Sequence, residues 1–296
     1  MTVLAGGTGG AKLAAGLAEH DEVAVIANTG DDVEIYGVHV SPDPDLVTWW
    51  LAGMIDERGW GIAGDTFEEM KRHDDAWFQL GDRDLELCRL RTTALETMRL
   101  TEAHAKVVEA VGVKQRVLPM ADEPVRTHVR TPKGLRPFQE FMIVDRWAGP
   151  IEEVVLKGIE DARPTPEVRD ALATADAIVI GPSNPIISIG PILAVPGMRA
   201  ALRDAPAPVV AVSPFVGGQA VKGPTDDFCR SAGIELSGQG IADAYRDVID
   251  AIVADEPVEG IPALVTDTLM TDSATRRELA GKILEFAESA PSLDAG

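Results

Sequence analysis

Residues 2–13 read TVLAGGTGGAKL, and this stretch decides the fold. Its first part is an apolar run that two glycines interrupt, and from Ala11 onward apolar residues recur at helical spacing. A second apolar run, EVAVIA at residues 22–27, follows and ends in a polar cluster. The pattern predicts a β-α-β unit with a glycine loop before its helix, the module from which open parallel sheets are built.

Two later runs extend the predicted sheet. Residues 177–180 (AIVI) and 209–212 (VVAV) are short and apolar, as strands buried in a parallel sheet are, and turn-forming residues follow both. Another strand is expected over residues 263–266, between a helical stretch over about 243–255 and a closing helix over 273–288. The fold class is therefore α/β, and we expect a Rossmann-like open parallel sheet with helices on both faces.

The middle of the chain has a different pattern. Residues 65–111 read as helices, with Thr66 and Thr101 as caps, whereas residues 116–144 alternate apolar and polar residues as antiparallel strands do. We therefore expect a single α/β domain over residues 1–296 with a mixed α+β insert at about residues 65–160.

Composition excludes several classes of protein. The 27 Lys and Arg stand against 48 Asp and Glu, a net charge of −21 that argues against a nucleic-acid partner. Such an acidic, lysine-poor chain fits a salt-adapted surface. No apolar run approaches the roughly 18–20 residues of a membrane span, so we expect no membrane partner. No basic segment precedes the first strand, so we expect no secretory signal and a cytoplasmic location.

The two cysteines, Cys88 and Cys229, are too few for a disulfide framework. We expect both to be reduced structural residues, with a catalytic thiol as the alternative. The five histidines show no metal-ligand spacing.

The glycine-rich segment is a candidate phosphate site. Glycines let the backbone approach an anion, and the amides at a helix N-terminus favour phosphate. The segment matches neither G-x-G-x-x-G nor the P-loop pattern, and the second strand ends in Asn28 rather than in a ribose-binding acid. A purely structural turn is the alternative. The candidate residues are Gly6, Gly7, Thr8, Gly9, Gly10 and Lys12.

Two acidic clusters, NTGDD at 28–32 and SPDPD at 41–45, should meet the glycine segment at one crevice, since parallel sheets bind ligands at the carboxyl ends of their strands. Carboxylates that face a phosphate need a cation between them, and a hard divalent metal ion is the usual solution. The alternative is that these aspartates only cap helices and turns.

Two further clusters carry polar groups. In LGDRDL at 80–85, Arg83 could bind phosphate, and Asp82 or Asp84 could orient a hydroxyl; an exposed salt-bridged helix start is the alternative. In GPSNP at 181–185, two prolines hold Ser183 and Asn184 in a rigid polar turn, which could also exist without a ligand.

The ordered series of motifs resembles the 2-phospho-L-lactate transferase family of deazaflavin-coenzyme biosynthesis. The resemblance runs from Thr2 to about Asp272. Its motifs are GGTGGAKL, NTGDD, SPDPDL, WFQLGDRDL, VLPMADEPVRT, FQEF, IGPSNPIISIGPIL, AVSPFVGG and VTDTLMTD.

The resemblance implies transfer of a phospholactyl-type group from a guanosine diphosphate-linked donor to the ribityl hydroxyl of 7,8-didemethyl-8-hydroxy-5-deazariboflavin, with release of GMP. It also implies Mg²⁺ or another hard divalent metal. Family members differ in whether they carry phospholactate, phosphoenolpyruvate or a relative, and the sequence leaves this choice open. It leaves the oligomeric state open too, with a homodimer as one option.

The resemblance also implies roles for individual residues. Asp31 and Asp45 would bind the metal, with Asp32 and Asp43 as nearby reserves. The catalytic residues would be Asp31, Asp45, Asp82 and Arg83, and the substrate-binding residues Asp43, Asp45, Gln79 and Asp84. The nucleotide would lie between the glycine segment, Gly6 to Lys12, and the turn of Pro182, Ser183 and Asn184. The chain departs from the family pattern at Leu46, where a Thr is common, and at Cys88, where a His is common.

Two other functions compete with this interpretation. A nucleotide-sugar-binding regulatory protein could share the fold without transferase activity. An NAD-dependent oxidoreductase would need the third glycine and the ribose-binding acid that the sequence lacks.

Overall fold

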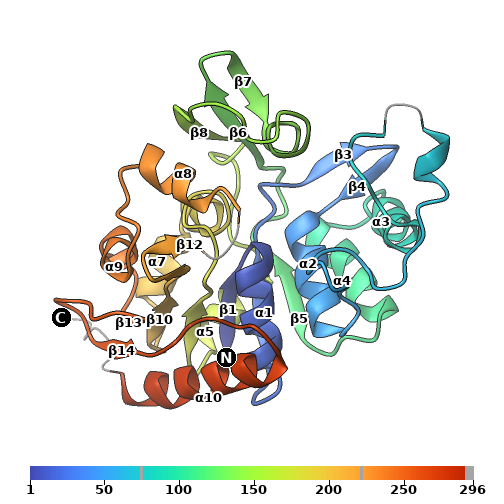
Figure 1. Cartoon of the computed structure of the whole chain (residues 1–296). Helices are drawn as coiled ribbons and strands as arrows, with labels where there is room; N and C mark the ends of the chain where they lie inside the picture. The colour runs from blue at the N-terminus through green and yellow to red at the C-terminus, as the bar shows by residue number, and fades with distance from the viewer. Residues whose placement is uncertain (74–75, 221–222, 291–296) are drawn as a thin grey trace.

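The computed structural model describes residues 1–73, 76–220 and 223–290, and seven parallel strands form its central sheet (Figure 1). Their order is β14-β13-β10-β9-β1-β2-β5. The chain therefore builds outward in both directions from β1, and the switch lies between β1 and β9. The strands are β1 (Thr2–Ala5), β2 (Ala24–Ala27), β5 (Arg116–Pro119), β9 (Ile178–Ile180), β10 (Val209–Val212), β13 (Ala251–Ala254) and β14 (Ala263–Val265).

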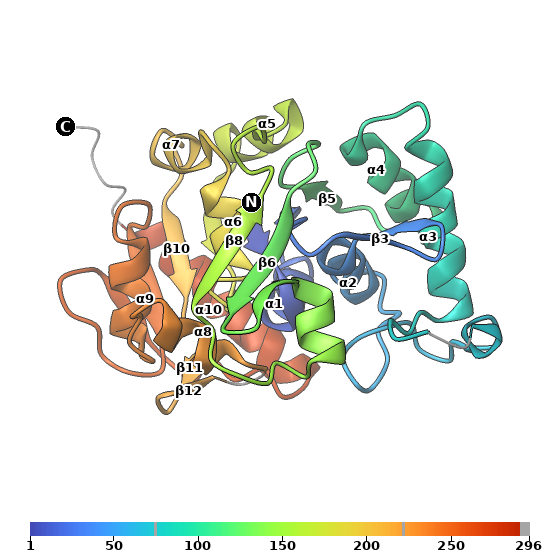
Figure 2. The ribbon, with the colours of Figure 1, turned by 90° about the horizontal axis from the view of Figure 1, so that it is seen from above.

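Helices cover both faces of this sheet, as the sequence predicts (Figure 2). Neighbouring strand residues alternate between the two faces, so Val3 and Leu4 belong to different hydrophobic cores. The Val3 side packs against α1 (Gly7–Leu17), α2 (Pro42–Leu51) and α10 (Ser273–Ser289). The Leu4 side packs against α5 (Pro166–Ala173), α6 (Ile189–Ala194), α7 (Met198–Arg203), α8 (Thr225–Ser231) and α9 (Gly238–Tyr245).

Two excursions leave the sheet, one on each side of β5. The first contains the hairpin β3 (Val33–Ile35) and β4 (Val38–Val40), then α2, the 3₁₀ turn η1 (Met70–Arg72), α3 (Asp82–Ala94) and α4 (Leu100–Ala110). The second is an antiparallel sheet of order β7-β6-β8, made of β6 (Arg126–Thr131), β7 (Gly134–Pro137) and β8 (Glu153–Lys157), with the π-helix η2 (Glu140–Val144). By residue number, β5 falls inside the insert predicted at about residues 65–160, but it is a strand of the central sheet.

A short strand pair, β11 (Phe215–Val216) and β12 (Gln219–Ala220), follows β10. No helix in the described part of the chain combines the length and the apolar character that a membrane span requires.

Several local predictions were wrong. The helix expected over about 243–255 ends at Tyr245, and residues 251–254 form the buried strand β13. The prediction failed because the periodicity of a short, fully buried apolar run does not distinguish a helix from a strand. β5 pairs in parallel with β2 instead of antiparallel with its neighbours. Thr66 and Thr101 are not N-caps, since Gly81 and Arg99 precede α3 and α4.

The glycine segment forms the first turn of α1 rather than a loop before it. The helix begins at Gly7, whose φ of +64° suits glycine, four residues before the predicted Ala11. A Cβ atom on Gly9 would lie 2.1 Å from the carbonyl oxygen of Pro182, and one on Gly10 would lie 2.6 Å from the Ser183 hydroxyl. The missing side chains therefore let α1 pack directly against the turn after β9.

We expect Gly9→Ala to lower the free energy of unfolding by about 1–3 kcal/mol, because the added methyl group must push α1 away from Pro182. Gly281→Ala, inside α10, is the matched control. Its Cβ would meet only His20 atoms at 3.7 Å or more, so it should stabilise the protein by about 0.5–1 kcal/mol. Urea unfolding measures both. Equal effects of the two substitutions would show that the α1 contact is not tight.

Candidate active site

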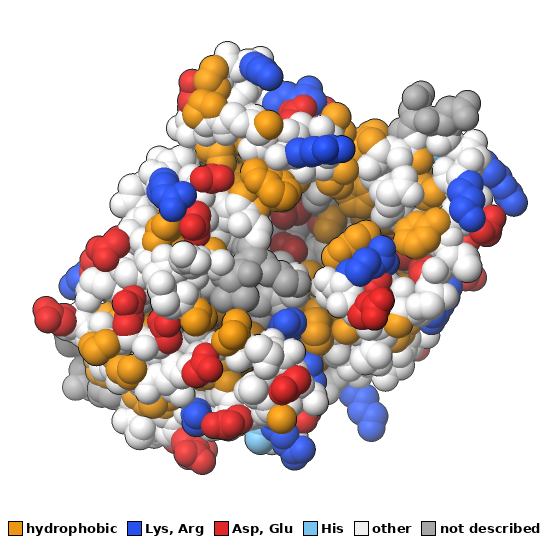
Figure 3. Space-filling model, in the orientation of Figure 1, with side chains coloured by type: hydrophobic (Ala, Val, Ile, Leu, Met, Phe, Trp, Pro, Cys, Tyr) orange, Lys and Arg blue, Asp and Glu red, His pale blue; other side chains and the backbone are white. Residues whose placement is uncertain are grey.

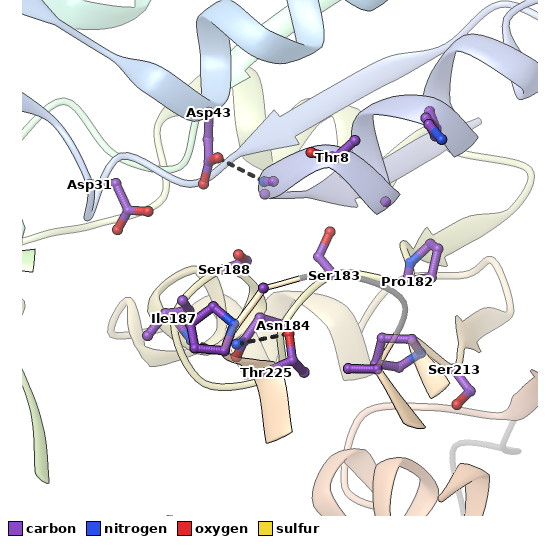
Figure 4. A pocket seen from close by; sticks show the side chains of 18 of the residues that line it. Thr8, Asp31, Asp43, Pro182, Ser183, Asn184, Ile187, Ser188, Ser213 and Thr225 are labelled. Carbon is purple, nitrogen blue, oxygen red and sulfur yellow. Dashed lines mark hydrogen bonds between the residues drawn. The ribbon is translucent and has the colours of Figure 1, made fainter. Parts of the chain in front are cut away.

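A cavity of about 330 Å³ opens at the carboxyl ends of β1, β2, β9, β10 and β14, and we call it the central cavity (Figure 4). It lies at the switch between β1 and β9, where open parallel sheets bind ligands. The structure brings together here most of the predicted nucleotide-binding residues with Asp31 and Asp43. Its polar lining includes Gly6, Gly7, Thr8, Gly9, Lys12, Asp31, Asp43, Ser183, Asn184, Ser188, Ser213, Thr225 and Thr268.

The N-terminus of α1 points its amides at this cavity. The Gly7 N–H donates to Asp43 Oδ1 at 2.7 Å, and the Gly10 N–H donates to Ser183 Oγ at 3.0 Å. Among the described residues, no group accepts from the N–H groups of Thr8 and Gly9. Two amides at the positive end of a helix are therefore free to bind an anion such as phosphate. Gly10 lies behind this surface and does not line the cavity.

Two buried carboxylates face the same space. Asp31 is 7% exposed and Asp43 is 6% exposed, and both point into the central cavity (Figure 4). Asn28 Nδ2 donates to Asp43 Oδ2 at 2.9 Å, whereas Asp31 Oδ1 has no hydrogen-bond partner among the described residues. No basic side chain in the described ranges forms an ion pair with either carboxylate.

Burial changes the protonation of this pair. Burial raises the pKa of Asp31 well above its ordinary value, and the negative charge of Asp43 raises it further. Burial also raises the pKa of Asp43 to about 6, although hydrogen bonds from Asn28 and Gly7 oppose the shift. A divalent cation bound by both carboxylates would supply the missing positive charge. An unpartnered, buried carboxylate oxygen at Asp31 and the oxygen-only donor set fit a hard metal ion such as Mg²⁺.

Local structure fixes the position of both carboxylates. Asp31 follows β2 in a turn where the Gly30 N–H donates to Asn28 Oδ1 at 2.8 Å and Gln139 Nε2 donates to the Asp31 carbonyl at 3.1 Å. Asp43 lies in the first turn of α2, which Pro42 begins. The pair therefore belongs to two rigid elements, not to a free loop.

A second cavity of about 180 Å³ adjoins the first, and Asp43 lines both. We call it the aromatic cavity, because Trp49, Trp60, Phe67 and Phe78 form much of its wall. Trp60 is 48% exposed, and the Arg58 guanidinium carbon lies 4.0 Å from the centre of its ring. Flat apolar walls of this kind suit a planar aromatic ligand.

All four predicted substrate-binding residues line the aromatic cavity. Asp43 is shared with the central cavity, whereas Asp45, Gln79 and Asp84 line the aromatic cavity together with Leu46. Gln79 is exposed and donates its side-chain amide to the Ala76 carbonyl at 2.5 Å. Burial raises the pKa of Asp84 to about 7, and the charge on Asp45 adds to this shift. A carboxylate that titrates near neutral pH can accept a proton from a bound hydroxyl.

Asp45 is separated from Asp31 and already has a cationic partner. Arg91 is fully buried, and its Nη1 and Nη2 atoms donate to the two Asp45 oxygens at 2.5 and 2.9 Å. Asp45 lines the aromatic cavity, whereas Asp31 lines the central one. The predicted metal pair Asp31 and Asp45 thus line two adjoining cavities, and Asp43, whose charge acts on Asp31, lines both.

The remaining predicted residues have local partners. Asp82 accepts hydrogen bonds from the Glu68 and Glu69 amides, and the Thr66 hydroxyl also donates to it. Arg83 is exposed, and its Nη1 reaches the Ala63 carbonyl at 3.3 Å. Neither Asp82 nor Arg83 lines any of the three cavities described here, so the structure offers them no ligand.

Asp32 and Cys88 also have local surroundings that account for their state. Asp32 accepts from Ser41 Oγ at 2.7 Å and pairs with His39 Nε2 at 2.9 Å. Burial lowers the pKa of His39, but its hydrogen bonds with Asp32 and Glu34 outweigh that effect and raise it to about 9. Burial raises the pKa of the Cys88 thiol, which is the opposite of what a nucleophile needs.

A third cavity of about 240 Å³, which we call the side cavity, shares Asp31 and Phe138 with the central one. Arg126 and Thr127 line it, and sequence reasoning gave neither residue a role. Both belong to the motif VLPMADEPVRT, which carried the resemblance without a function attached to it. Arg91 and Thr268 were missed as well, because only the fold shows that they are buried beside the cavities.

The chain is similar to known transferases over almost its whole length. The family described as 2-phospho-L-lactate transferase CofD matches residues 1–276. A 2-phospho-L-lactate transferase from Methanosarcina mazei is 37% identical, over 96% of this chain and 99% of its own. One from Methanopyrus kandleri is 38% identical, over 97% of both chains. A phosphoenolpyruvate transferase from Kitasatospora aureofaciens is 40% identical, over 97% of this chain and 98% of its own.

Solved structures confirm the fold. A Bacillus halodurans protein of the UPF0052 family superposes with a TM-score of 0.65 at 17% identity, over 96% of this chain and 99% of its own. At this identity the likeness concerns the fold alone.

We expect Arg91→Met to lower the free energy of unfolding by about 3–5 kcal/mol, because it leaves the buried Asp45 carboxylate without a partner. Adding Asp45→Asn should recover a large part of the loss, since the unpaired charge is then gone. Chemical denaturation measures both.

The control for this pair is Arg89→Met on the same helix. Arg89 pairs with Glu69 while half exposed, so its replacement should cost about 1 kcal/mol or less. The importance of the buried pair would be refuted if Arg91→Met were no more costly than Arg89→Met.

Proposed function

Because the chain belongs to the 2-phospho-L-lactate transferase family, we propose that it moves a phospholactyl-type group from a guanosine diphosphate-linked donor to the ribityl hydroxyl of 7,8-didemethyl-8-hydroxy-5-deazariboflavin, releasing GMP. The protein is a transferase; the donor, the acceptor and the metal are parts of the proposal. The observation that carries it is the position of Asp43, which lines both the central and the aromatic cavity. One carboxylate thus stands where a phosphorylated donor and a planar acceptor can meet.

The central cavity is the proposed donor site. The amides of Thr8 and Gly9 would bind the diphosphate, and Lys12 lines the same wall. The reacting phosphorus would lie near Asp43, because the acceptor cavity adjoins the donor cavity there. The guanosine would then extend the other way, toward Ser213 and Thr268 at the ends of β10 and β14.

Asp31 and Asp43 are the residues that would hold Mg²⁺. This pair replaces the Asp31 and Asp45 pair of the sequence prediction, because Arg91 binds both oxygens of Asp45. A bound divalent cation would neutralise charge that develops on the phosphoryl oxygens during transfer. In its absence, the two carboxylates would repel a diphosphate.

The aromatic cavity is the proposed acceptor site, with Trp60 and Phe67 against the deazaflavin ring and Gln79 at the cavity mouth. The ribityl hydroxyl oxygen forms a new bond to the phosphorus that carries the acid. The bond from that phosphorus to GMP breaks, and GMP leaves with the bridging oxygen. We assign Asp84, whose pKa burial raises to about 7, as the group that accepts the hydroxyl proton.

Neither competing function gains support from the site. An NAD-binding site needs an acid at the end of β2, and there the side chain of Asn28 donates to Asp43. A nucleotide-sugar-binding regulator would not need the aromatic cavity beside the nucleotide. The carried acid stays open, since relatives named for phospholactate and for phosphoenolpyruvate are 37–40% identical to this chain.

The direct test is mass spectrometry of the product formed from the deazaflavin and each guanosine diphosphate-linked donor, with and without Mg²⁺. We expect a phosphodiester of the deazaflavin and an equal amount of GMP with at least one donor. No product from either donor, together with no saturable binding of the deazaflavin at micromolar concentration, would contradict the proposal.

Asp31→Asn should lower turnover by at least about 10²-fold, because phosphoryl transfer depends on charge stabilisation at this point. The same change should stabilise the metal-free protein near pH 8. In the parent protein, the pKa of Asp31 is higher in the folded state than the value near 4 in the unfolded state. The carboxyl group therefore contributes stability at a pH below the unfolded pKa, and the parent loses this contribution as the pH rises through the folded pKa. The stability difference between variant and parent should therefore grow with pH.

Thermal unfolding with added metal completes this test. Mg²⁺ at about 100 times its Kd should stabilise the parent protein by about 2.7 kcal/mol and have little effect on Asp31→Asn. Asp176→Asn, on the exposed turn before β9, is the control and should respond to Mg²⁺ as the parent does. An equal response of Asp31→Asn would remove Asp31 from the metal site.

A further inference from the structure

The side cavity holds neither the nucleotide nor the deazaflavin in the proposed transfer. It lies between the Asp31 turn and the small sheet of β6, β7 and β8, which stands above the central sheet in Figure 1. Figure 3 shows a hollow with acidic side chains inside it below that small sheet. The side cavity meets the central cavity at Asp31 and Phe138. A group bound there would lie next to the proposed reacting phosphorus.

Two sequence motifs that the proposed function did not use end at this cavity. VLPMADEPVRT, residues 117–127, supplies Arg126 and Thr127, and FQEF, residues 138–141, supplies Phe138 and Gln139. The two segments lie side by side, because β6 and β7 pair as antiparallel neighbours with His128 opposite Pro137. The hairpin therefore brings Arg126, Thr127, Phe138 and Gln139 to the same wall of the side cavity.

The polar groups of this wall suit a small anion. Thr127 is only 3% exposed and lines the cavity; its hydroxyl makes no hydrogen bond of good geometry to a described residue, but it interacts with the Asp31 carboxyl and lowers the pKa of Asp31. The Arg126 side chain is 23% exposed; its Nη1 donates to the Val125 carbonyl at 2.8 Å and its Nη2 to Glu34. A guanidinium has five N–H donors in a fork that matches a carboxylate, so Arg126 can bind one while it keeps its present bonds.

The acids of this cavity are mostly paired with cations. Glu34 pairs with Arg126 and His39, Asp32 pairs with His39, and Glu140 pairs with Arg136 at 3.1 Å. Asp31 faces the proposed metal position. The side cavity therefore has less uncompensated negative charge than its residue types suggest.

The walls of the side cavity are attached to the Asp31 turn. The Thr127 N–H donates to the Gly30 carbonyl at 2.6 Å, and Gln139 donates to the Asp31 carbonyl. A Cβ on Gly30 would lie 2.6 Å from the Thr127 hydroxyl oxygen, so the two segments are in close contact. A group held by Arg126 and Thr127 would thus have a fixed position relative to Asp31.

The chemistry of the proposed reaction needs a third compartment. The reacting phosphorus carries the leaving GMP, receives the acceptor hydroxyl, and keeps its ester bond to a three-carbon acid. The central cavity takes the first group and the aromatic cavity the second. We propose, resting on the proposed function, that the side cavity binds the carboxylate of the transferred acid through Arg126 and Thr127 and thereby helps to select that acid.

The test compares guanosine diphosphate with the guanosine diphosphate-linked phospho-acid donor, because the two differ only in the acid. Calorimetric titration would give both Kd values for the parent and for each variant, in Mg²⁺ without acceptor. We expect Arg126→Gln to weaken donor binding about 10- to 100-fold and GDP binding by no more than about twofold. Thr127→Val, which removes the hydroxyl and keeps the shape, should weaken donor binding about 3- to 10-fold, again without an effect on GDP.

Two further variants separate ligand binding from a structural ion pair. Glu34→Gln removes the same ion pair from its other side and a carboxylate that competes for Arg126, so donor binding should become stronger. Arg130→Gln is the matched control; this arginine lies on β6, pairs with Glu153 and lines none of the three cavities. It should leave both Kd values unchanged.

Three results would each overturn the proposal. Arg126→Gln could lower the affinity for donor and for GDP in equal measure, or it could lower neither. Glu34→Gln could weaken donor binding, which would make the ion pair structural. Failure of the parent protein to form product would refute the proposed function instead, and the two failures are therefore distinguishable.

Discussion

The contact between the first turn of α1 and the turn after β9 is the constraint on which the site depends. A backbone carbonyl and a hydroxyl occupy the space that side chains on Gly9 and Gly10 would need. Because the two segments touch, the ends of β1 and β9 form one floor, and the amides of Thr8 and Gly9 face the cavity above it. Hydrogen bonds from Gly7 and Asn28 to Asp43 then connect this floor to α2 and β2. A network of backbone and short side chains thus places the carboxylates with little freedom.

This arrangement would allow a strongly acidic protein to bind the anionic nucleotide of the proposed reaction. The net charge of −21 is spread over the whole molecule, and exposed charges more than about 10 Å apart are screened by salt. The field at the site comes from nearer groups: helix amides, Lys12 and two buried carboxylates that need a cation. The buried Arg91 and Asp45 pair keeps one more carboxylate neutralised next to the aromatic cavity.

The sequence predicted the architecture well and the chemistry only in part. Apolar runs located β1, β2, β9 and β10, because strands buried on both faces leave a clear signal, and a short apolar run also located the partly exposed edge strand β14. The sequence prediction failed for β13, because four consecutive apolar residues show neither the periodicity of a helix nor that of a strand. The sequence predicted that Asp31 and the glycine segment with Gly9 lie near each other, because the carboxyl ends of parallel strands share one edge of the sheet. The link between Asp45 and Arg91 could not be predicted, since 46 residues separate the partners and only packing brings them together.

The position of β5 separates the two excursions. The chain leaves the sheet after β2, forms the wall of the aromatic cavity, and returns to the sheet at β5 before it builds the wall of the side cavity. A change of length in one excursion is therefore absorbed before the other begins. In evolutionary terms, the second excursion can diverge without altering the wall of the aromatic cavity, whereas the side cavity, to which both excursions contribute, ties the two together through Arg126 and Glu34.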